Sequence, residues 1–233
     1  MPDLISSNTY ALTPNRSINV NGTAFAYRDL GPRTGVPVVL LNHWGAVLDN
    51  FDPAIVDGLA AQHRIIAIDY RGIGASDGQA PLTIDAMARD TIALIRAMGF
   101  EQVDLLGFSL GGFVAQDVTL KAPTLVRKLI LTGTGPAGGV GIDQVGNVSR
   151  PLMLKGLFTL RDPKYYLFFT SSVASRGAAR AFLQRIKERT SDRDKPATPT
   201  ALLRQLKAIK AWGRQAPQDL STLRLPVLIA NGD

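Results

Sequence analysis

Residues 103–113 read Val-Asp-Leu-Leu-Gly-Phe-Ser-Leu-Gly-Gly-Phe, an apolar run that breaks at a glycine-rich turn and continues as a helical pattern. We interpret it as a strand, a sharp turn and a helix, with Ser109 at the turn. Gly107 and Gly111 are needed there because any side chain would collide with neighbouring backbone. A serine hydroxyl becomes a nucleophile when the chain exposes it and a base takes its proton. Ser109 is therefore the candidate nucleophile; the alternative is a glycine-rich turn without chemistry.

The residue after the serine is a second candidate, through its backbone. The amide of Leu110 begins the predicted helix, so its N–H points to the place where an oxyanion would form. The positive end of the helix dipole reinforces this donor. Leu110 is therefore a candidate oxyanion donor.

The composition is that of an ordinary globular chain. Hydrophobic residues make up 45% of the 233 positions and charged residues 19%, which favours one domain with an insertion. The absence of cysteine excludes disulfides, thiolate catalysis and cysteine-ligated zinc. Residues 1–8 lack the basic start and apolar centre of a secretory signal, and no apolar run reaches membrane-spanning length. We expect a cytoplasmic protein with no membrane partner.

The formal net charge is +7, and basic residues concentrate between Arg176 and Arg214. They stand within helical patterns and are not interleaved with aromatic residues that would stack on bases. The pattern therefore favours a solvated helix face, and no nucleic-acid partner is expected.

Strands alternate with helices over the first part of the chain. Asn21-Gly22 is a hairpin turn, and residues 37–42 and 64–69 are continuous apolar runs typical of strands buried on both faces. The alternation predicts a mostly parallel sheet with helices on both faces, whose chemistry collects at the carboxyl ends of the strands. Four groups would share that rim: Asn42-His43-Trp44, Asp69-Tyr70-Arg71, Ser109 and Gly133-Thr134-Gly135.

This alternation stops after residue 135. Residues 136–219 open with glycines and carry helical patterns broken by prolines, so we interpret them as a helical cap over the rim. Residues 1–135 would form the core, and residues 220–233 return to a core strand. Six apolar residues of the cap would line a pocket or form the cap's own core: Met153, Leu154, Leu157, Phe158, Phe168 and Phe169.

With these elements in order, the chain resembles the α/β-hydrolase superfamily over nearly its whole length. Its Asp-x-Arg-Gly-x-Gly-x-Ser turn at residues 69–76 and its Gly-Phe-Ser-Leu-Gly-Gly elbow at residues 107–112 are similar to those of the capped branch that holds esterases, lactonases and cofactor-free perhydrolases. The resemblance implies an α/β-hydrolase fold in which Ser109 is the nucleophile of acyl transfer.

The same resemblance assigns a second oxyanion donor. In the family, the strand before the first helix usually ends His-Gly-x, and the amide of x binds the oxyanion. Asn42, His43 and Trp44 take these three places in this sequence. The resemblance therefore implies an oxyanion hole made by the backbone amides of Trp44 and Leu110.

The family's acid follows a Gly-x-x-Asp turn after the late strand, and its histidine follows the final strand. This sequence reads Gly232-Asp233 at that turn and has no histidine after Ser109. We therefore expect a fold whose last strands and helices are missing, with the acid and the histidine not present in the chain. His63 precedes a strand and is expected on the opposite rim, His43 is expected to have a structural role, and Asp143 is a candidate displaced acid.

The resemblance implies a serine hydrolase that acts on a small apolar ester, thioester or lactone through an acyl-enzyme, without a metal or cofactor. Very low activity is expected of this chain because the acid and the histidine are absent. Two alternatives stay open: a non-catalytic hydrolase-fold protein that binds a small apolar molecule, and a truncated fragment without activity. Hydrolysis versus perhydrolysis and a homo-oligomeric state also stay open.

Overall fold

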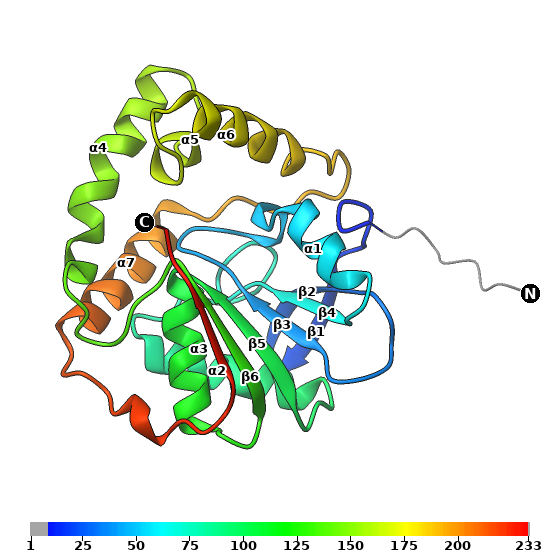
Figure 1. The fold of residues 1–233 in the computed structure, drawn as a ribbon. Helices are drawn as coiled ribbons and strands as arrows, with labels where there is room; N and C mark the ends of the chain where they lie inside the picture. Colours follow the sequence, from blue (N-terminus) through cyan, green and yellow to red (C-terminus); the bar gives the residue numbers. More distant parts are fainter. Residues whose placement is uncertain (1–8, 233) are drawn as a thin grey trace, which may run out of the picture.

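The computed structural model describes residues 9–232 as a seven-stranded sheet flanked by helices (Figure 1). The strand order is β1-β2-β4-β3-β5-β6-β7. β2 pairs antiparallel with β1 and with β4, and the remaining neighbours are parallel. The strands are β1 Arg16–Val20, β2 Thr23–Leu30, β3 Val38–Leu41, β4 Ile65–Ile68, β5 Val103–Phe108, β6 Val126–Thr132 and β7 Val227–Ala230.

Side chains of the central strands alternate between two buried clusters, one on each face of the sheet. On β3, Val39 and Leu41 belong to the cluster that includes α2 and α3, whereas Val38 and Leu40 join Val56 of α1. Burial on both faces explains why these strands read as continuous apolar runs. Three helices complete these layers: α1 Pro53–Ala60, α2 Ile84–Ala97 and α3 Leu110–Lys121.

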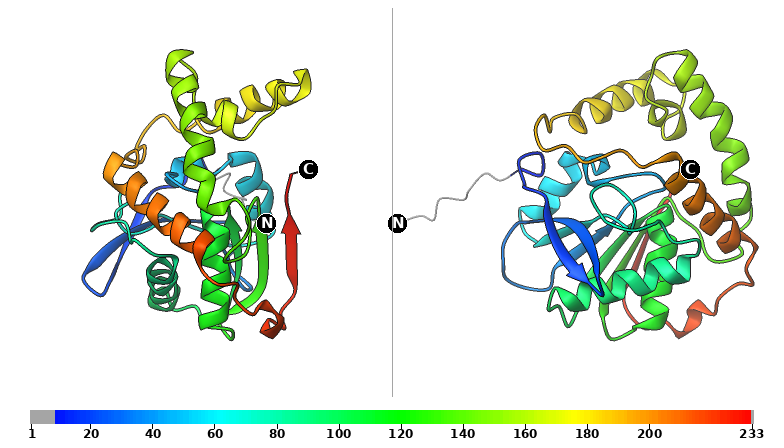
Figure 2. Two further views of the ribbon diagram at one scale, coloured as in Figure 1. Left: turned by 90° about the vertical axis from the view of Figure 1, so that its left-hand side faces the viewer. Right: turned by 180° about the vertical axis from the view of Figure 1, so that it is seen from behind.

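Four further helices fall between β6 and β7, within residues 136–219, which we call the helical segment. They are α4 Val145–Phe158, α5 Lys164–Leu167, α6 Val173–Arg185 and α7 Pro199–Arg214. Short 3-10 turns occur along the described chain at η1 Leu48–Asn50, η2 Ile142–Gln144 and η3 Leu220–Thr222. The upper part of α4, with α5 and α6, extends away from the core (Figure 2). The division of the chain at residues 135 and 219 into core and cap stays a prediction.

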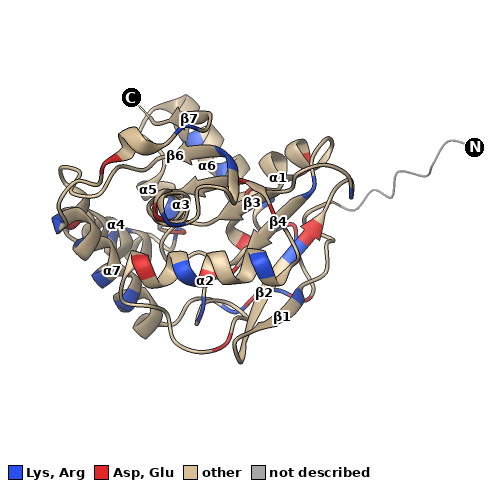
Figure 3. Cartoon of the chain, turned by 90° about the horizontal axis from the view of Figure 1, so that it is seen from below, with Lys and Arg blue, Asp and Glu red and all other residues tan. Residues whose placement is uncertain are grey.

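Unlike those helices, α7 packs directly on the core. The Trp212 ring stacks on Phe113 of α3, with 5.6 Å between the ring centroids. The helix is amphipathic: Gln205 and Ile209 are buried on one face, whereas Lys207 and Arg214 are exposed on the other (Figure 3). Lys207 and Arg214 therefore lie on a solvated face, as the sequence pattern indicates, whereas the half-buried Arg204 donates to the Ala80 carbonyl.

Candidate active site

Ser109 stands between β5 and α3 in a strained backbone conformation, with φ 54° and ψ −114°. A non-glycine residue with positive φ persists only where its surroundings hold it. Here the amide of Ser109 donates to the Thr132 carbonyl at 2.9 Å, and the Ser109 carbonyl accepts from the Gly112 amide and the Thr134 hydroxyl, both at 2.8 Å. The end of β6 therefore fixes the turn that carries the serine.

Glycines on both sides of Ser109 allow this turn to pack closely. A Cβ atom on Gly107 would collide with the carbonyl of Gly111, and one on Gly111 would collide with the carbonyl of Leu41 in β3. A Cβ on Gly112 would overlap the Thr134 side chain. The glycine requirement predicted from the sequence at positions 107 and 111 is confirmed: Gly107 lies against the backbone of the turn itself, and Gly111 against the end of β3.

The loop after β3 forms the opposite wall of the site. The Asn42 side chain accepts from the His43 amide at 2.9 Å and donates to the Val47 carbonyl at 3.1 Å, which closes the loop on itself. The Tyr70 hydroxyl donates to the Asn42 carbonyl at 3.3 Å. Asn42 therefore has a structural role, and the following Trp44 is held in place.

The backbone amides of Trp44 and Leu110 are both without a hydrogen-bond acceptor among residues 9–232. Leu110 is the first residue of α3, so its N–H has no partner within the helix. Unpaired amides at a helix start are ready donors for an anion. Both residues are the oxyanion donors predicted from the sequence, and their role in an oxyanion hole stays a prediction.

Helix α7 anchors the loop that carries Trp44. The indole Nε1 of Trp44 donates to the Leu202 carbonyl at 2.9 Å, and the Gly45 amide donates to Oε1 of the buried Gln205 at 2.9 Å. Gly45 has φ 71°, and a Cβ there would collide with the Leu202 side chain. The sequence does not predict that Leu202 and Gln205 hold this loop, because a contact across about 160 residues leaves no local pattern.

A cavity of about 290 Å³ lies between Ser109, the β3 loop and the helical segment. Its lining is mainly apolar, with Ser149 and the pair Asp162 and Lys164 as polar groups on the helical segment. Of the six apolar residues considered for a pocket, Met153 and Phe168 line this cavity. Leu154, Leu157 and Phe158 are exposed instead, and Phe169 packs on Phe182. The lining residues are His43, Trp44, Gly45, Ser109, Phe113, Val145, Ser149, Met153, Asp162, Pro163, Lys164, Leu167, Phe168, Leu202 and Ile209.

His43 lines the same cavity but makes an internal contact. Its Nδ1 lies 2.9 Å from the Trp44 carbonyl, and its Nε2 is buried without a partner in the described chain. Burial lowers the pKa of His43 to about 4, so the ring is neutral at neutral pH. The contact supports the structural role expected from the sequence and adds an unpaired acceptor near Ser109.

The other two titratable candidates do not line the cavity. His63 is exposed just before β4, at the end of the sheet opposite Ser109, as expected. Asp143 lies in η2, where its carboxylate accepts from Gln144 at 2.7 Å and pairs with Arg214 at 3.5 Å. The described residues contain no group of three His, Cys, Asp or Glu side chains that could hold a metal ion. No helix in residues 9–232 has the length and apolar character needed to cross a membrane.

A buried polar network beneath the site positions α7. The carboxyl group of Asp69, which follows β4, lies against that of Asp194, which precedes α7. Asp194 also accepts from the Leu48 amide at 3.2 Å, and its own amide donates to Asp49 at 2.9 Å. Asp49 pairs with the buried Arg28. The chain that leads into α7 is therefore fixed to the core through charged groups.

Two carboxyl groups in contact cannot both be ionised without strong repulsion. Burial, followed by the hydrogen bond to Asp194, raises the pKa of Asp69 well above its usual range. Asp69 therefore binds its proton more tightly than an isolated carboxyl group does. Gly74 leaves the space that this pair occupies, because a Cβ there would overlap both carboxyl groups.

A strained serine at a strand-to-helix turn, at the carboxyl rim of a mostly parallel sheet, is the arrangement typical of the elbow of an α/β-hydrolase fold. The family profile described as alpha/beta hydrolase fold matches residues 36–147. A solved alpha/beta hydrolase fold protein from Chitinophaga pinensis superposes with a TM-score of 0.88 at 36% identity, over 95% of this chain and 80% of that one. The chain belongs to the α/β-hydrolase superfamily.

Curated relatives match a shorter part of the chain. Proline iminopeptidase PfmaB of Pestalotiopsis fici is 37% identical over 124 residues, which are 52% of this chain and 44% of that protein. Non-heme chloroperoxidase of Streptomyces lividans is 37% identical over 120 residues, 50% of this chain and 43% of that protein. The match therefore spans less than half the length of each of these relatives.

Proposed function

We propose that Ser109 is the nucleophile of a serine hydrolase site that acts on a small apolar ester, thioester or lactone through an acyl-enzyme. The observation that carries the proposal is the strained serine, which lines a cavity beside two backbone amides with no acceptor in residues 9–232. Strain of this kind concentrates at functional sites. The relatives named as an iminopeptidase and a chloroperoxidase support an enzyme and leave its substrate open.

In this mechanism the Ser109 oxygen attacks the carbonyl carbon and loses its proton. The carbonyl oxygen becomes an oxyanion, which accepts hydrogen bonds from the amides of Trp44 and Leu110. Loss of one such donor typically costs about 2.7–4 kcal/mol of transition-state stabilisation. The tetrahedral species then expels the alcohol or thiol, which takes up a proton, and water hydrolyses the acyl-enzyme. If hydrogen peroxide replaces water, the product is a peracid.

The base is the weak part of this site. The Ser109 hydroxyl has no hydrogen-bond partner in the described part of the chain, and His43 is neutral, with Nδ1 on a carbonyl and no carboxylate. A general base works best when its pKa is near the operating pH. We therefore expect slow turnover from this chain. Oxyanion donors and binding alone leave about 10³–10⁴-fold catalysis over water in a serine protease without its triad.

Covalent labelling tests the nucleophile independently of turnover. A fluorophosphonate probe should phosphonylate Ser109, identified by mass spectrometry of the tryptic peptide, and Ser109→Ala should abolish the adduct. Ser149→Ala is the matched control, because Ser149 lines the same cavity and its hydroxyl donates to the Val145 carbonyl at 2.7 Å. An adduct on Ser149 alone, or a robust esterase rate that Ser109→Ala leaves unchanged, would show the mechanism to be wrong.

A second candidate is a non-catalytic binder of small apolar molecules. The cavity favours it, because the lining is mainly apolar and the residues described include no base in contact with Ser109. Saturable binding of an apolar ketone or ester, with no fluorophosphonate adduct and with no p-nitrophenyl butyrate hydrolysis above that of Ser109→Ala, would establish this alternative. An adduct together with a burst of product from p-nitrophenyl butyrate would exclude it.

A further inference from the structure

His43 holds a buried acceptor that the proposed mechanism does not use. Its side chain is 8% exposed, and Nε2 has no partner within residues 9–232. Buried polar atoms without partners are rare in folded proteins, and each one requires an explanation. His43 lines the cavity that contains Ser109, so a bound molecule is in a position to supply the missing partner.

The contacts of the ring show which nitrogen carries the proton. Nδ1 is 2.9 Å from the Trp44 carbonyl, and a carbonyl oxygen only accepts hydrogen bonds. Nδ1 therefore donates, and in the neutral ring Nε2 carries the lone pair. Because burial lowers the pKa of His43 to about 4, this tautomer persists through the neutral range. Nε2 is thus a fixed acceptor.

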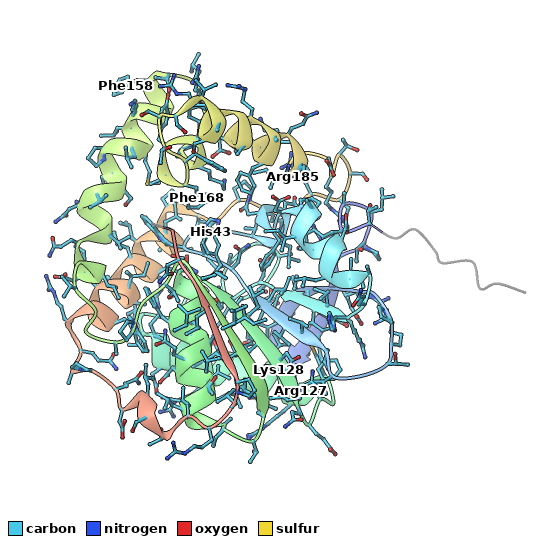
Figure 4. All side chains as sticks on the ribbon, viewed as in Figure 1. His43, Arg127, Lys128, Phe158, Phe168 and Arg185 are labelled. Atoms are coloured by element: carbon cyan, nitrogen blue, oxygen red, sulfur yellow. The ribbon has the colours of Figure 1, made fainter. Side chains whose placement is uncertain are left out.

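Two phenylalanines enclose the ring, one from the core and one from the helical segment. The centroids of Phe108 and Phe168 lie 5.3 and 5.1 Å from that of His43, both edge to face. Phe108 belongs to β5, whereas Phe168 follows the four-residue α5 and is 39% exposed. Figure 4 shows Phe168 above His43, where the helical segment meets the core. Displacement of Phe168 would open a path to Nε2.

We propose that Nε2 of His43 accepts a hydrogen bond from the substrate, so that the site selects acyl compounds with an O–H or N–H group on the atom next to the scissile carbonyl. This specificity rests on the proposed function, because it places that carbonyl at Ser109 and the Trp44 amide. His43 and Trp44 are adjacent in the chain, and both line the cavity that contains Ser109, so the proposal places the donor on the atom beside the carbonyl. Esters of 2-hydroxy acids and of N-acylated 2-amino acids have this chemistry.

A role for His43 as the base of Ser109 fits the geometry less well. Base action creates an imidazolium, which a carboxylate hydrogen-bonded to Nδ1 normally stabilises. Here Nδ1 faces the Trp44 carbonyl, and burial of the ring, the main cause of its lowered pKa, disfavours a positive charge. An acceptor that stays neutral is suited to specificity.

Ligand binding to the intact chain tests this inference without turnover. 2-Hydroxyacetophenone and propiophenone have the same shape and carbonyl, neither has a leaving group, and only the first has a donor beside the carbonyl. We expect the hydroxyketone to bind about tenfold more tightly by calorimetry, the value of one added hydrogen bond. His43→Phe, which keeps an aromatic ring between Phe108 and Phe168, should remove the preference.

A spectroscopic readout keeps the test independent of that variant's folding. The sequence has two histidines, so ¹H–¹⁵N multiple-bond spectra of the wild-type chain, assigned with His63→Gln, report Nε2 of His43 directly. The hydroxyketone should shift the Nε2 resonance toward that of a hydrogen-bonded nitrogen, and propiophenone should not. Equal binding and equal shifts would overturn the inference even if fluorophosphonate labels Ser109. A preference for the hydroxyketone without a fluorophosphonate adduct on Ser109 would support the proposed hydrogen bond to His43 and count against the hydrolase function.

Discussion

At the scale of single residues, the backbone of Ser109 is strained by the same turn that presents its hydroxyl to the cavity. Its φ of 54° with ψ of −114° is a conformation that glycine adopts without strain and serine does not. Contacts with Thr132 and Thr134 hold the residue there. The strain should be measurable as a gain in stability when it is relieved.

Ser109→Gly should raise the free energy of unfolding relative to Ser109→Ala by about 1 kcal/mol, the low end of the cost of such a conformation. Both variants lack the hydroxyl and should lose the fluorophosphonate adduct, so their difference isolates the backbone. Chemical denaturation monitored by tryptophan fluorescence provides the comparison. Equal stability of the two variants would mean that position 109 is not strained.

Trp44 has two separable roles: its indole holds the loop against α7, and its backbone amide belongs to the proposed oxyanion hole. Trp44→Phe removes the indole donor to Leu202 and keeps the amide of the proposed oxyanion hole. We expect a loss of about 1 kcal/mol in stability, typical of one hydrogen bond, and slower phosphonylation of Ser109 because the loop is less well held. Phe113→Leu, which perturbs α7 packing at Trp212, is the control for general loosening of the helix. An unchanged labelling rate in Trp44→Phe would separate the indole contact from the site.

At the scale of elements, polar contacts attach α7 to the core both in the chain that precedes the helix and within the helix itself. Asp194, just before the helix, meets Asp69 and Asp49, and Gln205 within the helix holds Gly45. Such contacts fix direction and register, whereas apolar packing alone is less specific. The position of the Trp44 loop thus depends in part on the contact between the carboxyl groups of Asp69 and Asp194.

This dependence predicts a pH effect with a defined sign. The pKa of Asp69 is raised in the folded chain above its ordinary value, so the folded state binds the proton more tightly than the unfolded state. The stabilisation is full below the unfolded pKa, near 4, and is lost as the pH rises through the higher folded pKa. Asp69→Asn keeps a donor at this position at every pH. Its stability relative to the wild type should therefore increase from pH 5 to pH 9.

Thermal melts across that range measure the difference. Asp77→Asn, which changes an exposed carboxyl on the same turn, controls for altered net charge. A stability difference between Asp69→Asn and the wild type that does not vary with pH would mean that folding does not raise the pKa of Asp69.

At the scale of the whole molecule, the sequence predicted the features that local patterns encode. Gly107 and Gly111 marked the elbow because the turn needs glycine within a few residues, and continuous apolar runs marked the buried strands. The contact of Gln205 with Gly45 and that of Asp194 with Asp69 join residues more than 120 positions apart, so neither leaves a periodic signal. The sequence likewise could not show which apolar residues of α4 line the cavity and which are exposed, because that depends on the elements packed against the helix.

The exposed edge of the sheet at β7 leads us to expect self-association in solution. It pairs with β6 on one side, and its Leu228 and Ile229 side chains are 60% and 63% exposed. An exposed apolar strand at a sheet edge is a template for pairing with another chain. The net charge of +7 opposes such contact, and salt screens that repulsion. We therefore expect association that increases with protein concentration and with ionic strength, measured by sedimentation velocity.

Ile229→Lys should reduce this association, because a lysine on an edge strand opposes strand pairing. Val140→Lys is the control, because it adds the same charge at an exposed apolar site outside the sheet. If both substitutions reduce association to the same extent, charge and not the β7 edge controls self-association.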